Sequence, residues 1–167
     1  MFTTITDFER AWAEQSGETA KLLKALTDAS LAQQVAPQAR TLGRLAWHIT
    51  GSIAEMANRT GLRVAGPAED APVPPRATEI LAAYEESARS LGEQVKRAWR
   101  DETLLVEDKM YGQPWKRGYT LYVLIQHETH HRGQMTVLMR QAGLPVAGVC
   151  GPSREEWATF GMPAPAI

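Results

Sequence analysis

Thiol groups, excess charge and long apolar runs are all scarce in this chain of 167 residues. Its one cysteine, Cys150, cannot form an internal disulfide, which agrees with a reducing compartment. Lysine and arginine total 18 against 19 acidic residues, so the basic excess of a nucleic-acid-binding protein is missing. No apolar stretch approaches the roughly 18 residues of a membrane span, and no secretory signal opens the sequence. We therefore expect a cytoplasmic protein that binds neither nucleic acid nor membrane.

Length and composition predict a single globular domain. Hydrophobic residues make up 44% and charged residues 22% of the chain, close to the average of folded proteins. Because a domain typically has about 100 to 200 residues, we expect residues 1–167 to form one domain around one core.

The ten prolines leave four long windows in which helices can form. A proline inside a helix costs about 3 kcal/mol, and residues 1–36, 38–66, 76–113 and 115–144 contain none. Within these windows apolar residues recur at three- and four-residue spacing, as on one face of a helix. The sequence therefore predicts an all-α four-helix bundle with long connections.

The expected helices begin and end at recognisable signals. They run over about 5–27, 40–60, 77–100 and 118–142. Thr78 is a plausible N-cap of the third helix, and Gly143 followed by Pro145 is a usual helix stop.

Three segments lie outside the helices. Residues 66–75 are a proline-rich connector, and residues 101–117 contain a turn or short hairpin around Tyr111-Gly112-Gln113-Pro114. The segment from Leu144 onward is rich in glycine and proline, and Ser153-Arg154-Glu155-Glu156-Trp157 within it predicts a capped final helical turn or two.

Two of the four histidines, His127 and His131, share one face of the fourth helix. Residues four apart lie about 40° apart around a helix and one turn along it, so both imidazoles can reach one ion. The same arc contains the apolar side chains of Leu121, Leu124, Met135 and Leu138. A buried imidazole pair needs two sets of hydrogen-bond partners, whereas a metal ion satisfies both rings at once. The pair therefore predicts a metal site inside the bundle.

A third ligand has to come from another helix, and His48 is the one histidine outside the fourth helix. Three neutral imidazoles leave coordination positions open for water or substrate, as in catalytic zinc sites. Taken alone, a histidine such as His48 is more often an ordinary satisfied or surface residue than a ligand, and a carboxylate such as Glu55 or Glu128 is the alternative ligand. His130 lies off the centre of the apolar arc, so we do not expect it to bind metal.

Two polar residues of the fourth helix, Gln134 and Thr120, lie near the predicted ligands on the helical wheel. Either one could orient an imidazole or a bound water, although polar residues are equally common at the edge of a bundle.

The segment His127-Glu128-Thr129-His130-His131 also satisfies the H-E-x-x-H pattern. In zinc peptidases of that type the glutamate is the general base, and a third ligand follows downstream, here Glu155 or Glu156. Such enzymes need a strand-rich subdomain above the zinc helix, and this sequence offers little strand signal. The peptidase is therefore the less favoured interpretation.

Three motifs together resemble the DinB/YfiT-like family of metal-dependent enzymes. They are His127-x-x-x-His131-Arg132-Gly133-Gln134, Leu45-Ala46-Trp47-His48-Ile49, and the tail Gly-Pro-Ser-Arg-Glu-Glu-Trp. The resemblance covers nearly the whole chain. It implies a four-helix bundle that presents His48, His127 and His131 to one divalent metal ion.

The same resemblance implies a reaction class. Some relatives transfer thiols such as mycothiol, bacillithiol or glutathione, and others isomerise related thiol compounds. We therefore expect a thiol S-transferase or related detoxification enzyme that acts on a small-molecule substrate. A metal-binding helical protein without turnover is the alternative. Imidazole ligands suit several metals, of which zinc or nickel is expected.

Self-association is a further expectation from the sequence. The resemblance implies a homodimer, because relatives of this family are often dimers. An outlying Trp12, with an apolar face on the first or the third helix, would supply the interface.

Overall fold

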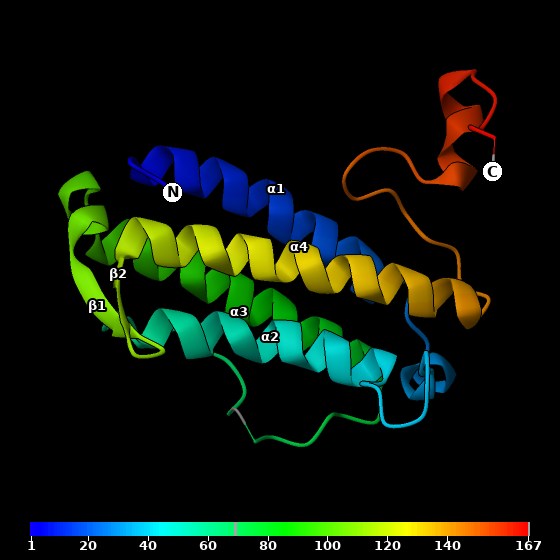
Figure 1. Ribbon diagram of the computed structural model, residues 1–167, viewed down its shortest axis with the longest axis horizontal. Coiled ribbons are helices and arrows are strands. Elements are labelled where there is room, and N and C mark those ends of the chain that lie inside the picture. Colours follow the sequence, from blue (N-terminus) through cyan, green and yellow to red (C-terminus); the bar gives the residue numbers. More distant parts are fainter. Residues whose placement is uncertain (69, 167) are drawn as a thin grey trace.

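The computed structural model describes residues 1–68 and 70–166. Four long helices build it, namely α1 (Ile5–Lys24), α2 (Leu42–Asn58), α3 (Ala77–Ala98) and α4 (Arg117–Gln141). Figure 1 shows α1 and α4 running in one direction and α2 and α3 in the other. Both α1 and α2 pack against α3 and α4. The predicted all-α four-helix bundle is thus confirmed.

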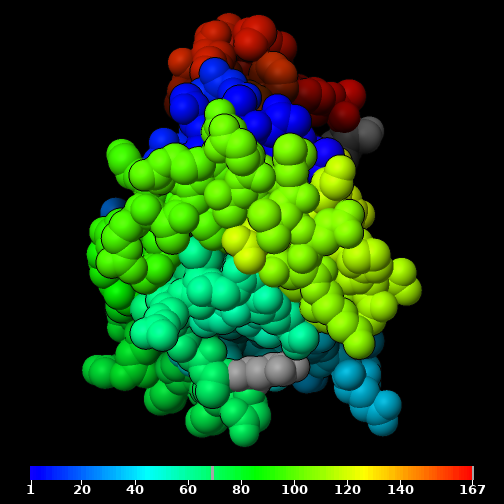
Figure 2. All heavy atoms as spheres, turned by 90° about the vertical axis from the view of Figure 1, so that its left-hand side faces the viewer, coloured from blue at the N-terminus to red at the C-terminus, as the bar shows by residue number. Residues whose placement is uncertain are grey.

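The shorter elements connect or follow the four long helices. They are the 3-10 helices η1 (Asp28–Ala32), η2 (Asp101–Leu105) and η3 (Arg154–Phe160), and the strands β1 (Glu107–Met110) and β2 (Gln113–Lys116). Figure 2 looks onto one end, which η2 and the hairpin of β1 and β2 cover. The hairpin confirms the predicted turn, since Tyr111 and Gly112 take φ angles of 50° and 86° between paired Met110 and Gln113.

Helix boundaries agree with the expected ones to within two residues, except at the end of α1. There the helix stops at Lys24 instead of Thr27. Thr27 begins the next element, because its hydroxyl oxygen accepts a hydrogen bond from the backbone N–H of Ser30 and caps η1. Thr27 therefore belongs to the start of η1 and not to the end of α1.

The N-terminus of α3 is capped by a residue far away in the sequence. The expected cap, Thr78, is wrong, because the N-cap position is occupied by Arg76, which makes no side-chain capping bond. Instead Asp28 of η1 accepts a hydrogen bond of 2.7 Å from the backbone N–H of Ala77. A carboxylate also suits the positive end of the helix dipole.

The apolar core lies between the four long helices. The apolar arc predicted for α4 is confirmed, since Leu121, Leu124, Met135 and Leu138 are all buried. Trp12 belongs to this core with 4% of its surface exposed, and its indole N–H donates to the Ala88 carbonyl oxygen at 2.9 Å. The expectation that Trp12 is an outlying side chain is therefore wrong. Among the described residues, no helix combines the length and hydropathy that crossing a membrane takes.

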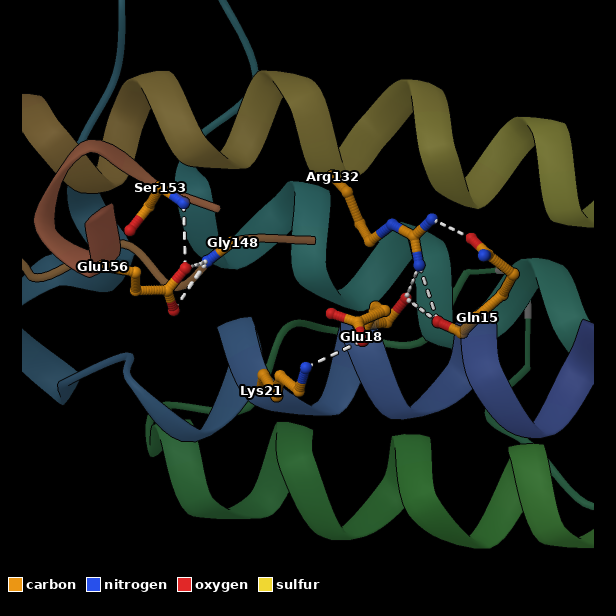
Figure 3. Close-up of polar contacts among 8 residues, drawn as sticks. Gln15, Glu18, Lys21, Arg132, Gly148, Ser153 and Glu156 are labelled. Carbon is orange, nitrogen blue, oxygen red and sulfur yellow. Dashed lines mark hydrogen bonds and ion pairs between the residues drawn. The ribbon is translucent and has the colours of Figure 1, made fainter. Parts of the chain in front are cut away.

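The segment after α4 ends in η3 (Figure 1), and residues of this segment and of α1 line one hollow. Here the carboxylate of Glu156 accepts hydrogen bonds from the backbone N–H groups of Ser153 at 2.8 Å and Gly148 at 3.0 Å (Figure 3). The bond from Ser153 is the glutamate half of a capping box at the start of η3, where the sequence predicts a capped helical turn.

Candidate metal centre

Three histidines from two helices meet inside the bundle. His48 lies on α2, and His127 and His131 lie one turn apart on α4. The Nε2 atoms of His48 and His131 each lie 3.1 Å from Nε2 of His127. The ligand atoms of all three lie within 4.8 Å of one another, and no other such group of His, Cys, Asp or Glu occurs in the described residues. The structure thus brings together the three residues that the sequence singled out.

The packing of α2 against α4 explains this convergence. The spacing of four residues turns His127 and His131 toward α2, where His48 faces them. His130 is exposed; although its ring centroid lies 4.9 Å from that of His131, it is outside the group. His130 is therefore not among the residues whose ligand atoms converge.

Gln134 fixes the orientation and tautomer of one imidazole. Its side-chain oxygen lies 2.7 Å from Nδ1 of His131. Because that oxygen can only accept, Nδ1 carries the proton and the lone pair on Nε2 faces the other histidines. Thr120 has no such role, since its hydroxyl lies 3.5 Å from the carbonyl oxygen of Lys116, the residue before α4. Of the two polar residues considered from the sequence, only Gln134 contacts an imidazole.

Burial keeps the three imidazoles uncharged. It is the largest influence that lowers the pKa of His48 to about 4, followed by the positive charge of Arg40. Burial and then the neighbouring His131 lower the pKa of His127 to about 4. The pKa of His131 is lowered mainly by burial, against the hydrogen bond to Gln134, which raises it. At neutral pH the rings therefore have free lone pairs, which metal binding requires.

Glu128 points away from the histidines, toward α1 and α3. Its Oε2 atom accepts hydrogen bonds from the hydroxyl groups of Thr19 at 2.9 Å and Tyr84 at 3.1 Å. Burial raises the pKa of Glu128 to about 7, while these two hydrogen bonds and the charge of Arg132 lower it. A general base for hydrolysis must lie beside the attacking water. The carboxylate of the H-E-x-x-H pattern is instead part of the packing between helices.

The other carboxylates considered as ligands are also engaged elsewhere. Glu55 pairs with Arg59 at 2.6 Å and accepts from the Tyr111 hydroxyl at 2.6 Å. In the tail, Glu155 pairs with Arg140 at 2.5 Å, and Glu156 binds backbone N–H groups. None of them belongs to the histidine group.

Arg132 is the buried polar residue that sequence reasoning missed. Its side chain is 1% exposed and crosses from α4 to α1 (Figure 3), where Nη1 donates to the Gln15 carbonyl oxygen at 2.6 Å. The same nitrogen lies 3.3 Å from the Thr19 hydroxyl, which also contacts Glu128. The available signal was the spacing of four residues between Glu128 and Arg132, which suits an ion pair on one helix face.

A cavity of about 660 Å³ gives access to the histidines. His48 and His127 form part of its wall, together with Arg40, Arg44 and Tyr111. A second hollow, of about 390 Å³, is lined by His131 and Gln134 and shares Arg40 with the first. The three imidazoles are therefore enclosed by the bundle on one side and reachable by small molecules on the other.

Comparison with known proteins identifies the family. The sequence model of the DinB family matches residues 1–165. The chain belongs to the DinB family. It is 46% identical over 165 residues to the uncharacterized protein YrdA of Bacillus subtilis (strain 168), and the match covers 99% of both chains. The family that the three sequence motifs resemble is thus confirmed.

Solved structures of DinB-like proteins share the fold. A DinB-like protein from Bacillus cereus ATCC 10987 has a TM-score of 0.86 and 43% identity, covering 89% of this chain and 99% of its own. The DinB-like protein YjoA from Bacillus subtilis has a TM-score of 0.66 and 18% identity, over 82% of this chain and 92% of its own. Because the identity to YjoA is only 18%, this similarity shows a shared fold alone.

Proposed function

We propose that this DinB-family protein binds one divalent metal ion through His48, His127 and His131 and transfers a small thiol to an electrophile. The observation that carries the proposal is the meeting of three Nε2 atoms, 3.1 Å apart in two pairs, at the wall of an open cavity. Family membership supports the reaction class, because the resemblance to this family implies thiol transfer.

The spacing of the nitrogens fits a metal ion. Zinc binds imidazole nitrogen at about 2.0–2.1 Å in tetrahedral sites, so two ligands of one ion lie about 3.3 Å apart. The observed separations of 3.1 Å are close to this value. The Gln134 hydrogen bond to His131 is the kind of outer partner that metal-binding imidazoles usually have. We favour zinc or nickel as the metal.

An open coordination position favours a catalytic site over a structural one. Structural zinc sites have four protein ligands, whereas catalytic sites have three and an accessible fourth position. The described residues offer three ligands, and the cavity of about 660 Å³ lies beside two of them. This arrangement supports an enzyme. It is less suited to a protein that only stores the metal or is only stabilised by it.

In the proposed reaction the metal would activate the thiol, and the thiol, which comes from outside the protein, would attack the electrophile. A divalent ion at this place would lower the pKa of a thiol that binds beside it and favour the thiolate. In the reaction the S–H bond breaks and its proton passes to solvent in the cavity. A carbon–sulfur bond then forms while the leaving group departs with its electron pair. The thiol has to come from outside, because Cys150 is exposed in the tail and does not line the cavity.

Cobalt substitution tests the proposal directly. With cobalt in place of the native metal, we expect 2-mercaptoethanol to produce a sulfur-to-metal charge-transfer band. Cys150→Ser should leave the band unchanged. Glu128→Gln should retain metal and thiol binding, because the glutamate faces Thr19 and Tyr84.

Two outcomes would contradict the proposal. If the protein binds metal but no thiol produces a charge-transfer band, it is a metal-binding protein without thiol-transfer activity. Peptide cleavage that falls by about 10²-fold or more in Glu128→Gln, with zinc retained, would favour the hydrolase instead.

A further inference from the structure

The cavity beside the histidines carries positive charge that nothing in the described structure neutralises. Three arginines and one glutamate line it, and the glutamate, Glu55, pairs with Arg59 at 2.6 Å. The guanidinium groups of the other two, Arg40 and Arg44, have no hydrogen-bond or ion-pair partner among residues 1–68 and 70–166. The chain as a whole has a net charge of -1, so this local excess is not a general property of its surface.

Both arginines lie close to the candidate metal ligands. Arg44 precedes His48 by one turn of α2, and residues so spaced lie on the same helix face. Arg40 lines both hollows that reach the imidazoles, and its charge lowers the pKa of all three histidines. A ligand that occupies this cavity can therefore contact a guanidinium group and an imidazole at the same time.

Positive side chains beside a cation site lower the affinity of that site for the cation. Like charges repel, so Arg40 and Arg44 weaken the binding of a divalent ion in their neighbourhood. An anionic ligand reverses this effect, because it is attracted by the metal and by both guanidinium groups. Guanidinium groups also match the planar oxyanions of carboxylates and phosphates with paired hydrogen bonds.

We infer that the substrate or thiol of this site carries an oxyanion group, which Arg40 and Arg44 bind while another part of the same molecule reaches the three histidines. The inference rests on the proposed metal-dependent function and adds the charge class of the ligand. Arg40 and Arg44 are then specificity-determining residues for that ligand.

Three thiols of similar size and different charge test the inference. They are 3-mercaptopropionate, which is anionic, 2-mercaptoethanol, which is neutral, and cysteamine, which is cationic. Titrations follow the charge-transfer band of the cobalt-loaded protein at constant ionic strength, with each affinity corrected for the thiolate fraction. We expect the anionic thiol to bind about tenfold more tightly than the neutral one, and the cationic thiol to bind most weakly.

Substitution of the arginines should remove this preference. In the double variant Arg40→Gln with Arg44→Gln, 3-mercaptopropionate should lose about tenfold in affinity while 2-mercaptoethanol changes less than twofold. Changing both residues to lysine should restore part of the preference, because the charge returns without the fork of donors. Arg63→Gln is the matched control, since Arg63 is exposed and does not line the cavity. A preference that survives the double glutamine variant, or is missing from the parent protein, would overturn the inference.

The two proposals can fail separately. If no cobalt binds, the metal-dependent function is wrong, and calorimetry of the metal-free protein with the same thiols then decides whether an arginine-dependent preference exists. Acetate and inorganic phosphate, each competing against 3-mercaptopropionate, distinguish the two oxyanions. Stronger competition by acetate indicates a carboxylate ligand, and stronger competition by phosphate a phosphorylated one. If neither the cobalt titration nor the calorimetry shows an effect that depends on the arginines, the proposed anion site is wrong.

Discussion

At the scale of single residues, the candidate centre depends on where each nitrogen carries its proton. The Gln134 oxygen keeps the His131 proton on Nδ1, and burial keeps all three rings neutral. The Nε2 lone pair of His131 therefore faces the other two imidazoles before any ion arrives. Preorganisation of this kind lowers the cost of binding, since little has to be deprotonated or reoriented.

Loss of His48 should weaken zinc binding far more than loss of His130. In His48→Ala two imidazoles on one helix remain, and we expect affinity to fall about 100-fold or more, since even outer partners of ligands are worth 10–100-fold. His130→Ala should change affinity less than about threefold, because this exposed ring is outside the group. Titration calorimetry of untagged protein measures both. The reverse order would remove His48 from the site.

Stability of the metal-free protein should fall as pH falls from 6.5 to about 4. In the folded state the pKa values of His48 and His127 are about 4, against 6.5 for the ordinary group. Between these values the unfolded chain binds more protons, so the free energy of unfolding decreases with decreasing pH. Urea titrations across this range should give a shallower slope for His48→Gln than for the parent. Glu128, with its pKa raised to about 7, acts in the opposite direction but equally in both proteins.

At the scale of elements, α4 has two different environments. One of its faces carries histidines at the wall of the open cavity, and its first turn lies in close contact with the backbone of Phe2. A Cβ atom added at Gly118 would lie 2.2 Å from the Phe2 carbonyl oxygen, whereas one added at Gly133 would meet nothing within 4 Å. The same helix therefore contains one glycine that the packing requires and one that it does not.

Alanine at these two glycines should have opposite effects on stability. Gly118→Ala should lower the free energy of unfolding by about 1–3 kcal/mol, because backbone has to move to relieve the overlap. Gly133→Ala should raise it by about 0.5–1 kcal/mol through higher helix propensity. Chemical denaturation of both variants measures the difference. Equal destabilisation would mean that the contact with Phe2 is not the cause.

Sequence reasoning predicted the elements better than the polar contacts between them. Windows without proline and apolar periodicity are local signals, so they placed the four helices. The cap of α3 by Asp28 depends on two segments meeting in space, and no local pattern records this. The same holds for Arg132 and Glu128, whose burial depends on partners from α1 and α3. The histidines were predictable because His127 and His131 share a helix face and few other histidines exist.

At the scale of the whole molecule, a shallow groove between α1 and α3 is the candidate surface for the expected homodimer. It has a volume of about 490 Å³ and is lined by small residues, among them Ala13, Gly17, Ala20, Ala88 and Gly92. Because Trp12 is buried beneath this groove, small side chains would have to supply the contact instead.

Gly17→Arg should keep the protein monomeric if this groove is the dimer interface. The parent should sediment with twice the chain mass of 18.4 kDa at micromolar concentration. Nothing lies within 4 Å of a Cβ atom at Gly17, so the variant should fold normally while the new side chain blocks the groove. Gly133→Arg is the control on another helix. A parent protein that sediments near 18.4 kDa would contradict the prediction.

The separation of the histidines along the chain determines when the centre can first exist. His48 lies 79 positions before His127, on a helix that is synthesised long before α4. No nascent fragment that lacks α4 contains more than one of the three imidazoles. A chain still on the ribosome therefore cannot take up a metal ion at this place until α4 has emerged and docked against α2. Metal uptake would thus follow translation, and it would join the second helix to the last long one much as a covalent cross-link does.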